Sequence, residues 1–382
     1  MRNIRKDYNA WDIVKDALEC KTPDQVPTFC LGADWDFMER FYAEIGFTFK
    51  EFMQFKKDKI PWLCPVNIPL SIKLGVDLTW ITSLGQVIWL DEYSEPAQMH
   101  GGRFKVANRL SSYSPPDGVK KLPIPHWWYV KEGLKTKDQI REYMQKEIKY
   151  SKKEFKNYRK IIEICEEKYN LVVSVGITGP WENLHFGIGF GNIAKFWRKD
   201  RKFLREINKF YCDFALDGMR KLVQYAKPKV VMVGDDYGYN SGLQMSLEMW
   251  RELVKPTLAK HVEIVHKRGA KFMLHSCGNI GELFEDFVEI GIDGVESLKP
   301  FNNDLPALKQ KYGNDIALIG TIDDSKLLKY ADPSEVKKSV RNSIDNLGPN
   351  GYIPGATNFL LDQPPKNILA MFEAIRDYAI SE

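Results

Sequence analysis

Short apolar runs alternate with helix-length amphipathic stretches through most of this chain, and this alternation limits its fold more than any other feature. Six such runs occupy residues 171–176, 229–234, 271–275, 292–296, 316–320 and 351–354. Two more, at 26–30 and 76–81, precede them. Nearly continuous apolar strands separated by helices indicate a parallel sheet covered by helices. Eight such strands predict a (β/α)8 TIM barrel, an α/β fold.

The length of 382 residues suits one decorated barrel. We therefore expect a single domain over residues 1–382, with an N-terminal helical extension before the first strand. Residues 84–130 depart from the barrel rhythm. Two strand-like runs there, 86–90 and 103–106, predict a β-hairpin inserted after the second barrel strand. Residues 111–129, rich in proline and including Trp127 and Trp128, predict an aromatic lid over the barrel mouth.

Composition excludes several classes of protein. The 55 basic and 51 acidic residues nearly balance, which argues against a nucleic-acid-binding protein. No run of about 18 apolar residues occurs, so we expect no membrane span. Six scattered cysteines without a CxxC pair are typical of reduced thiols, and the polar N-terminus shows no secretory signal. These features predict a cytoplasmic, soluble protein. They leave the oligomeric state open, with a homo-oligomer as one option.

Ionisable side chains follow five of the six later strands, where the active sites of such barrels lie. These are Glu182 after the first, with Trp181 beside it, Asp235, Asp236 and Tyr237 after the second, His275 and Cys277 at the third, Glu296 at the fourth, and Asp323 at the fifth. Asn358 follows the sixth strand without a charge. Scattered surface charge would not gather at these points, so we interpret them as a catalytic mouth.

His275 and Cys277 are the most informative pair. Residues i and i+2 of a strand point to the same side, so the imidazole and the thiol leave the strand end together. Together they form a donor set that suits zinc. The alternative is a histidine buried beside a carboxylate and a small core cysteine.

The other polar positions also have two interpretations. Asp235 and Asp236 either serve the site or cap the following helix, but Ser246 already looks like the N-cap of that helix. Glu296 is either a metal ligand or the partner that orients His275. Residues 355–358 and Asp362 are either functional or simple turn residues.

The order of these features resembles the uroporphyrinogen decarboxylase superfamily, a (β/α)8 barrel, and especially its branch of cobalamin-dependent methyltransferases. The segments that carry the resemblance are 234–238, 246–255, 274–279, 291–296, 319–323 and 364–371. True uroporphyrinogen decarboxylases carry an arginine-rich loop after the first strand to hold porphyrin carboxylates. The corresponding residues 29–36 contain no arginine here and include two aspartates, which argues against tetrapyrrole decarboxylation.

The resemblance implies zinc held by a histidine, a cysteine two residues on, and a second cysteine after the last strand. His275 and Cys277 match the first two, whereas residues 354–358 contain no cysteine. Glu296, Asp236 or Asp323 would then complete a site with harder ligands, or no metal is bound. Such a change fits transfer of a methyl group from a donor that needs an acid to stabilise its leaving group.

The resulting hypothesis is a corrinoid-dependent methyltransferase that moves a methyl group between a small methylated substrate and a corrinoid carried by a separate protein. An aromatic methyl ether, giving O-demethylation, is one candidate substrate. The predicted roles are catalytic for His275, Asp236 and Glu296; metal-binding for His275, Cys277 and Glu296; and substrate-binding for Asp235, Tyr237, Trp181, Asp323 and Asn358. The alternatives are a decarboxylase or lyase of a non-porphyrin carboxylate, with Arg103 and Lys299 as its cations, and a non-catalytic binding barrel.

Overall fold

The computed structural model describes residues 7–46, 68–83, 87–88, 97–99, 102–107 and 126–380. Its centre is an eight-stranded parallel sheet with strands in the order β1, β2, β7, β8, β11, β12, β13, β14. These strands span Phe29–Cys30, Leu78–Ser83, Val172–Ile177, Val230–Gly234, Lys271–His275, Gly294–Glu296, Ala317–Ile319 and Tyr352–Ile353. All eight expected strands are present, so the predicted barrel is confirmed.

The first and last strands meet and close the cylinder. Phe29 of β1 forms a parallel bridge with Gly355, and its backbone N–H donates to Pro354 O over 3.1 Å. A Cβ atom at Gly355 would lie 2.4 Å from the Phe29 carbonyl oxygen, so this approach requires glycine. The strands are short at this junction, and a second parallel bridge, between Ala33 and Leu360, extends it.

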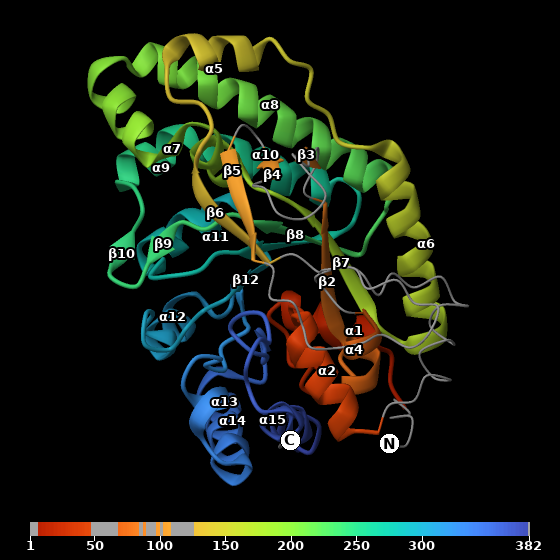
Figure 1. Cartoon of the computed structure of the whole chain (residues 1–382). Coiled ribbons are helices and arrows are strands. Elements are labelled where there is room, and N and C mark those ends of the chain that lie inside the picture. The colour runs from red at the N-terminus through yellow and green to blue at the C-terminus, as the bar shows by residue number, and fades with distance from the viewer. Residues whose placement is uncertain are drawn as a thin grey trace.

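Helices surround the strands, as Figure 1 shows. They are α1 (Ala10–Leu18), α2 (Trp35–Glu44), α4 (Ile68–Leu74), α5 (Lys137–Met144), α6 (Lys152–Tyr169), α7 (Pro180–Lys199), α8 (Arg201–Tyr225), α9 (Leu247–Leu253), α10 (Lys255–His266), α11 (Phe284–Ile290), α12 (Leu305–Tyr312), α13 (Leu327–Tyr330), α14 (Pro333–Leu347) and α15 (Pro365–Arg376), with a 3-10 turn at Gly281–Leu283. The described residues contain no helix that is both long enough and apolar enough to span a membrane.

Local sequence signals explain several helix starts. The side chain of Asp332 accepts hydrogen bonds from the first backbone N–H groups of α14, and Pro333 follows it as the first helical residue. Thr136 and Gln139 form a reciprocal capping box at α5. Ser246 caps α9, as expected. Helix α1 is the predicted N-terminal extension, and its Leu18 packs beside Gly294 at the start of β12.

The insertion after β2 is larger than the predicted hairpin. It forms a four-stranded antiparallel sheet in the order β3 (Val87–Ile88), β4 (Ala97–Met99), β5 (Gly102–Ala107) and β6 (His126–Glu132). The run at 103–106 therefore pairs with β4 and β6 rather than with the run at 86–90. Trp127 and Trp128 belong to a strand, and the rest of the predicted lid, 111–125, lies outside the described residues.

Candidate active site at the barrel mouth

Strand register brings the candidate residues together. His275, the last residue of β11, lies beside Gly234 of β8 on one side and beside Glu296 of β12 on the other. The chain leaves β8 directly into Asp235 and Asp236, so these aspartates emerge next to the histidine. The convergence follows from parallel strands that end at the same level.

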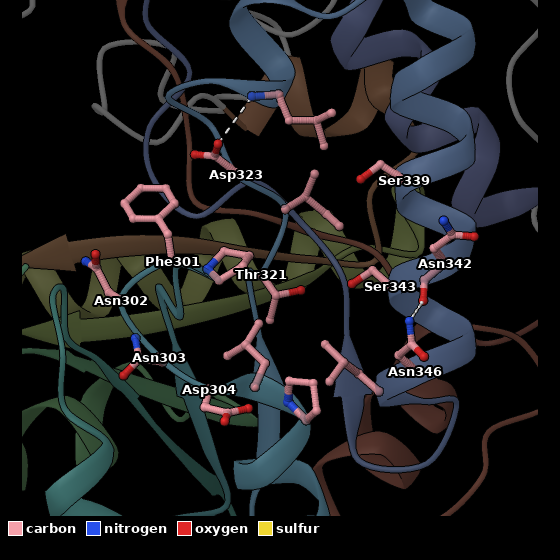
Figure 2. A pocket seen from close by; sticks show the side chains of 16 residues that line it. Phe301, Asn302, Asn303, Asp304, Thr321, Asp323, Ser339, Asn342, Ser343 and Asn346 are labelled. Carbon is pink, nitrogen blue, oxygen red and sulfur yellow. Dashed lines mark hydrogen bonds between the residues drawn. The ribbon is translucent and has the colours of Figure 1, made fainter.

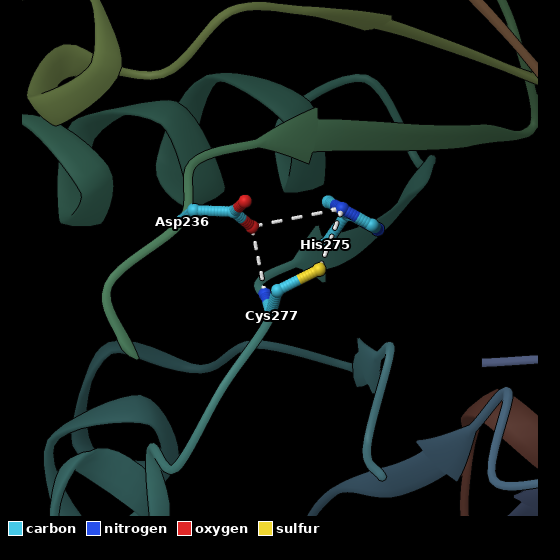
Figure 3. A group of neighbouring side chains, drawn as sticks. All are labelled: Asp236, His275 and Cys277. Atoms are coloured by element: carbon cyan, nitrogen blue, oxygen red, sulfur yellow. Dashed lines mark hydrogen bonds and ion pairs between the residues drawn. The ribbon is translucent and has the colours of Figure 1, made fainter. Parts of the chain in front are cut away.

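Asp236, His275 and Cys277 form one compact group, which Figure 3 shows. One ligand atom from each lies within 4.8 Å of the others. Nε2 of His275 is 3.7 Å from Oδ1 of Asp236 and 3.7 Å from Sγ of Cys277. The backbone N–H of Cys277 also donates to Oδ1 of Asp236 over 2.7 Å, which fixes the carboxylate relative to the thiol.

The two distances from Nε2 of His275 to its neighbours fit a zinc ion. Tetrahedral zinc with bonds of about 2.0–2.3 Å places its ligand atoms roughly 3.3–3.8 Å apart. One nitrogen, one oxygen and one sulfur are ligand types that zinc accepts, and three protein ligands leave a fourth position for substrate. The structure thus groups Asp236, rather than Glu296 or Asp323, with His275 and Cys277.

Glu296 contacts the opposite face of the histidine. Its Oε2 lies in short hydrogen-bonding contact with Nδ1 of His275, and the side chain has no exposed surface. Gly320, with φ +60°, leaves the space for it, because a Cβ there would lie 2.8 Å from Oε1 of Glu296. A carboxylate on the second ring nitrogen is the usual arrangement behind a metal-binding histidine. The geometry therefore favours the orienting role over the role of ligand.

Burial and neighbouring charges shift the pKa values of three residues in and behind this group. Burial disfavours a charged imidazole, but the neighbouring Glu296 and Cys277 outweigh it and hold the pKa of His275 well above its usual value. Burial, reinforced by the charge of Asp236, raises the pKa of the Cys277 thiol. Burial also raises the pKa of Glu296. A metal ion binding at Nε2 and Sγ would displace the protons held there.

Polar groups from two further strand ends surround the sulfur of Cys277. Ser297 Oγ lies 3.2 Å from Sγ and donates its proton to Thr357 O over 2.7 Å. The Asn358 side chain places Nδ2 3.7 Å from the same sulfur. Ser297 is fully buried, with a left-handed φ of +77°, a backbone conformation that is uncommon for residues other than glycine. Asn358, predicted to bind substrate, thus lies beside the candidate metal group.

Asp235, Tyr237 and Trp181 lie deeper than predicted for substrate-binding residues. The Asp235 carboxylate accepts hydrogen bonds from the backbone N–H groups of Trp181 and Glu182, in the first turn of α7, and from the Tyr237 hydroxyl. Asp235 thereby caps a helix that precedes it in the chain. All three residues are almost completely buried. Direct contact of these residues with substrate stays a prediction.

Glu182, which was placed at the mouth without a role, and Trp80, which was not predicted, both lie close to the group of Asp236, His275 and Cys277. Burial, together with the nearby carboxylates of Asp236 and Asp235, raises the pKa of Glu182 well above its usual value. The Trp80 ring lies nearly parallel to His275, with centroids 6.3 Å apart, and also contacts Phe359. The position of Glu182 after a strand was a usable signal. Trp80 lies inside β2, where a tryptophan is expected to be a core residue without a functional role.

Asp323 lies away from this group. Its carboxylate accepts hydrogen bonds from the backbone of Ser325, Lys326 and Leu327, and so caps the turn into α13. It borders a separate cavity of about 770 Å³ lined by the start of α12, the loop after β13 and one face of α14 (Figure 2). Asp236, His275 and Cys277 do not line that cavity. The predicted substrate role of Asp323 has no geometric link to His275.

The fold and the mouth together define a (β/α)8 barrel with a candidate metal-binding site at the carboxyl ends of its strands. The model of the family described as Uroporphyrinogen decarboxylase (URO-D) matches residues 129–378, well over half of the chain. The protein belongs to the uroporphyrinogen decarboxylase family, as the sequence features indicated. A search of curated protein sequences found no match.

Solved structures share this fold. A methyltransferase from Methanosarcina mazei superposes with a TM-score of 0.64 at 16% identity, over 97% of this chain and 98% of that chain. The pneumococcal virulence factor StrH gives a TM-score of 0.40 at 12% identity over 94% and 84% of the two chains. The 3-keto-D-glucoside 4-epimerase YcjR from E. coli gives 0.34 at 9% identity over 64% and 97%. The first of these likenesses shows a shared fold, and the last two are too weak to support any argument.

Proposed function

We propose that this protein is a corrinoid-dependent methyltransferase that takes a methyl group from a small oxygen-linked donor and delivers it to a corrinoid on a partner protein. The observation that carries the proposal is the compact group of Asp236, His275 and Cys277, which fits a three-ligand metal site with one open position. Membership of the URO-D family and the shared fold of a methyltransferase support it.

His275, Cys277 and Asp236 would hold the metal, here proposed as zinc, which supplies Lewis acidity to the oxygen that leaves when its bond to the methyl carbon breaks. Glu296 keeps a proton on Nδ1 of His275, so that Nε2 faces the metal position. The Cys277 N–H keeps Asp236 beside the thiol. Each residue of the group is therefore held by a neighbour before substrate arrives.

An oxygen-linked donor suits this site better than a thiol acceptor. Asp236 provides a hard oxygen ligand, which leaves the metal more electron-poor than a second thiolate would. Trp80 and Phe359 add aromatic surface beside His275, which suits a methoxyl-bearing ring. An aromatic methyl ether is therefore our proposed substrate class, with O-demethylation as the reaction.

The decarboxylase alternative receives less support. Asp235, Asp236 and Glu182 place three carboxyl groups near the mouth, and such a site disfavours a substrate that carries a carboxylate. Lys299, one of the two cations expected for that reaction, already pairs with Asp324 over 2.9 Å. The side chain of Arg103 lies outside the described residues.

The test combines metal analysis with a methyl-transfer assay. We expect about one zinc per chain, lost in Cys277→Ser and in Asp236→Asn. The zinc-loaded protein is then mixed with reduced cobalamin and a panel of methyl ethers, methanol and methylamines, and methylcobalamin formation is followed by absorbance. Formation with a methyl ether, and its absence in Asp236→Asn, supports the proposal. No methylcobalamin with any donor would count against it.

A second arm separates the remaining alternatives. Release of carbon dioxide from a carboxylate substrate without cobalamin would favour a decarboxylase. Ligand binding that survives in a His275→Ala, Cys277→Ala double variant, without turnover by the parent protein, would favour a non-catalytic barrel.

A further inference from the structure

The Cys277 sulfur has polar neighbours that the proposed reaction does not yet use. Besides His275, the described side chains within hydrogen-bonding distance of Sγ are Ser297 Oγ at 3.2 Å and Asn358 Nδ2 at 3.7 Å. Hydrogen bonds to a ligating sulfur change how much charge that sulfur gives to its metal. Which of these two neighbours donates to the sulfur therefore affects the chemistry of the site.

Ser297 has no proton left for the sulfur. Its hydroxyl carries one hydrogen, and that hydrogen is donated to Thr357 O over 2.7 Å. The left-handed backbone of Ser297 and its complete burial fix this arrangement. Towards Cys277, Ser297 presents only oxygen lone pairs.

Asn358 has the opposite polarity. Its Oδ1 accepts a hydrogen bond from the backbone N–H of Phe359 over 2.7 Å. This bond identifies which end of the amide is oxygen, because the reversed amide would set two donors against each other. The NH2 end is thereby directed at the sulfur.

We propose that Asn358 is a positioning residue whose Nδ2–H group donates to the sulfur of Cys277 and limits the charge that this sulfur gives to a bound metal. The inference rests on the metal site of the proposed function. A sulfur that donates less leaves the metal a stronger Lewis acid for an oxygen leaving group. Asn358 thus acts through Cys277 and needs no contact with the substrate.

Cobalt(II) provides a readout that does not depend on turnover. The metal-free protein is loaded with cobalt(II) alone, and the sulfur-to-cobalt charge-transfer band is recorded for the parent, Asn358→Leu and Asn358→Ala. Losing the N–H donor raises the energy of the sulfur lone pairs, so we expect the band to move to longer wavelength in both variants at one cobalt per chain. Asn346→Leu, on the exposed face of α14, is the matched control and should leave the band unchanged.

The outcomes are distinct. A band at the parent wavelength in both Asn358 variants, with cobalt still bound, would overturn the role of Asn358 and leave the metal site intact. A parent protein that takes up no cobalt would overturn the metal site and this inference with it. Using two variants of different size protects the test against one that fails to fold.

Discussion

Glu296 and His275 face each other across β11 and β12, and the Glu296 carboxylate contacts Nδ1 of the His275 ring. Glu296 has no exposed surface, so water does not compete for this contact. The contact fixes the ring with Nε2 towards Asp236 and Cys277. Metal binding in this protein is therefore expected to depend on a residue that lies behind the ligands.

Glu296→Gln tests that dependence. The substitution keeps size and removes the charge that favours the Nδ1–H tautomer, so we expect zinc affinity to fall about 10- to 100-fold. Competition with a chromophoric chelator measures the change. Glu289→Gln, on the surface of α11, is the control. In the described contacts Glu289 pairs only with Lys255, which is not part of the site. Parental affinity in Glu296→Gln would contradict the orienting role.

Gly320→Ala should disturb the same contact from the other side. Gly320 has φ +60°, and a Cβ there would lie 2.8 Å from Oε1 of Glu296 and 3.2 Å from Ala356 O. We expect a loss of about 1–3 kcal/mol in the free energy of unfolding, because a side chain strains this backbone, together with weaker zinc binding. Urea unfolding measures the first effect. Gly191→Ala in α7, where a Cβ meets nothing within 4 Å, should be neutral or stabilising.

Asp235→Ala tests the cap that Asp235 provides for α7. The change leaves two backbone N–H groups and the Tyr237 hydroxyl without their buried acceptor. We expect the free energy of unfolding to fall by about 2–4 kcal/mol. Asp332→Ala removes an exposed helix cap of the same chemistry and should cost about 1 kcal/mol. Equal losses in the two variants would show that burial adds nothing to the Asp235 cap.

His261 should make the fold sensitive to acid. Burial lowers the pKa of His261 from 6.5 to about 3, so the folded state keeps the ring neutral while the unfolded chain binds a proton below pH 6.5. The contribution of the neutral His261 to the free energy of unfolding is therefore fully present above pH 6.5 and is lost as the pH drops from 6.5 towards 3. We expect the difference in unfolding free energy between pH 7 and pH 5 to shrink in His261→Leu. The same difference in both proteins would contradict this prediction. His185, whose pKa burial also lowers to about 3, adds a similar dependence that remains in the variant.

The barrel could be predicted because its strands are unbroken apolar runs, and the run at 271–275 became β11 without any change of boundary. The insertion was harder. Its strand β6 pairs with β5 across about twenty intervening residues, so nothing local in the sequence of His126–Glu132 points to that partner. The aromatic residues near the end of 111–129 suggested a lid, but aromatic side chains also favour strands, and Trp127 and Trp128 lie in β6.

Part of the site could also be predicted from the sequence. His275 and Cys277 belong to one strand end, so their spacing is visible in the sequence, and their grouping with Asp236 follows from parallel register. Asp235 could not be placed from the sequence, because it caps a helix from an earlier part of the chain, whereas sequence signals for a cap concern the helix that follows. The separation of Asp323 from the group also depends on three-dimensional packing.

The seam between Phe29 and Gly355 lies on the side of the barrel that carries Asn358. Any side chain at position 355 would clash with the Phe29 carbonyl and push the first and last strands apart. The single hydrogen at Gly355 therefore keeps the first strand in contact with the end of the last one, directly beside the loop that carries Asn358.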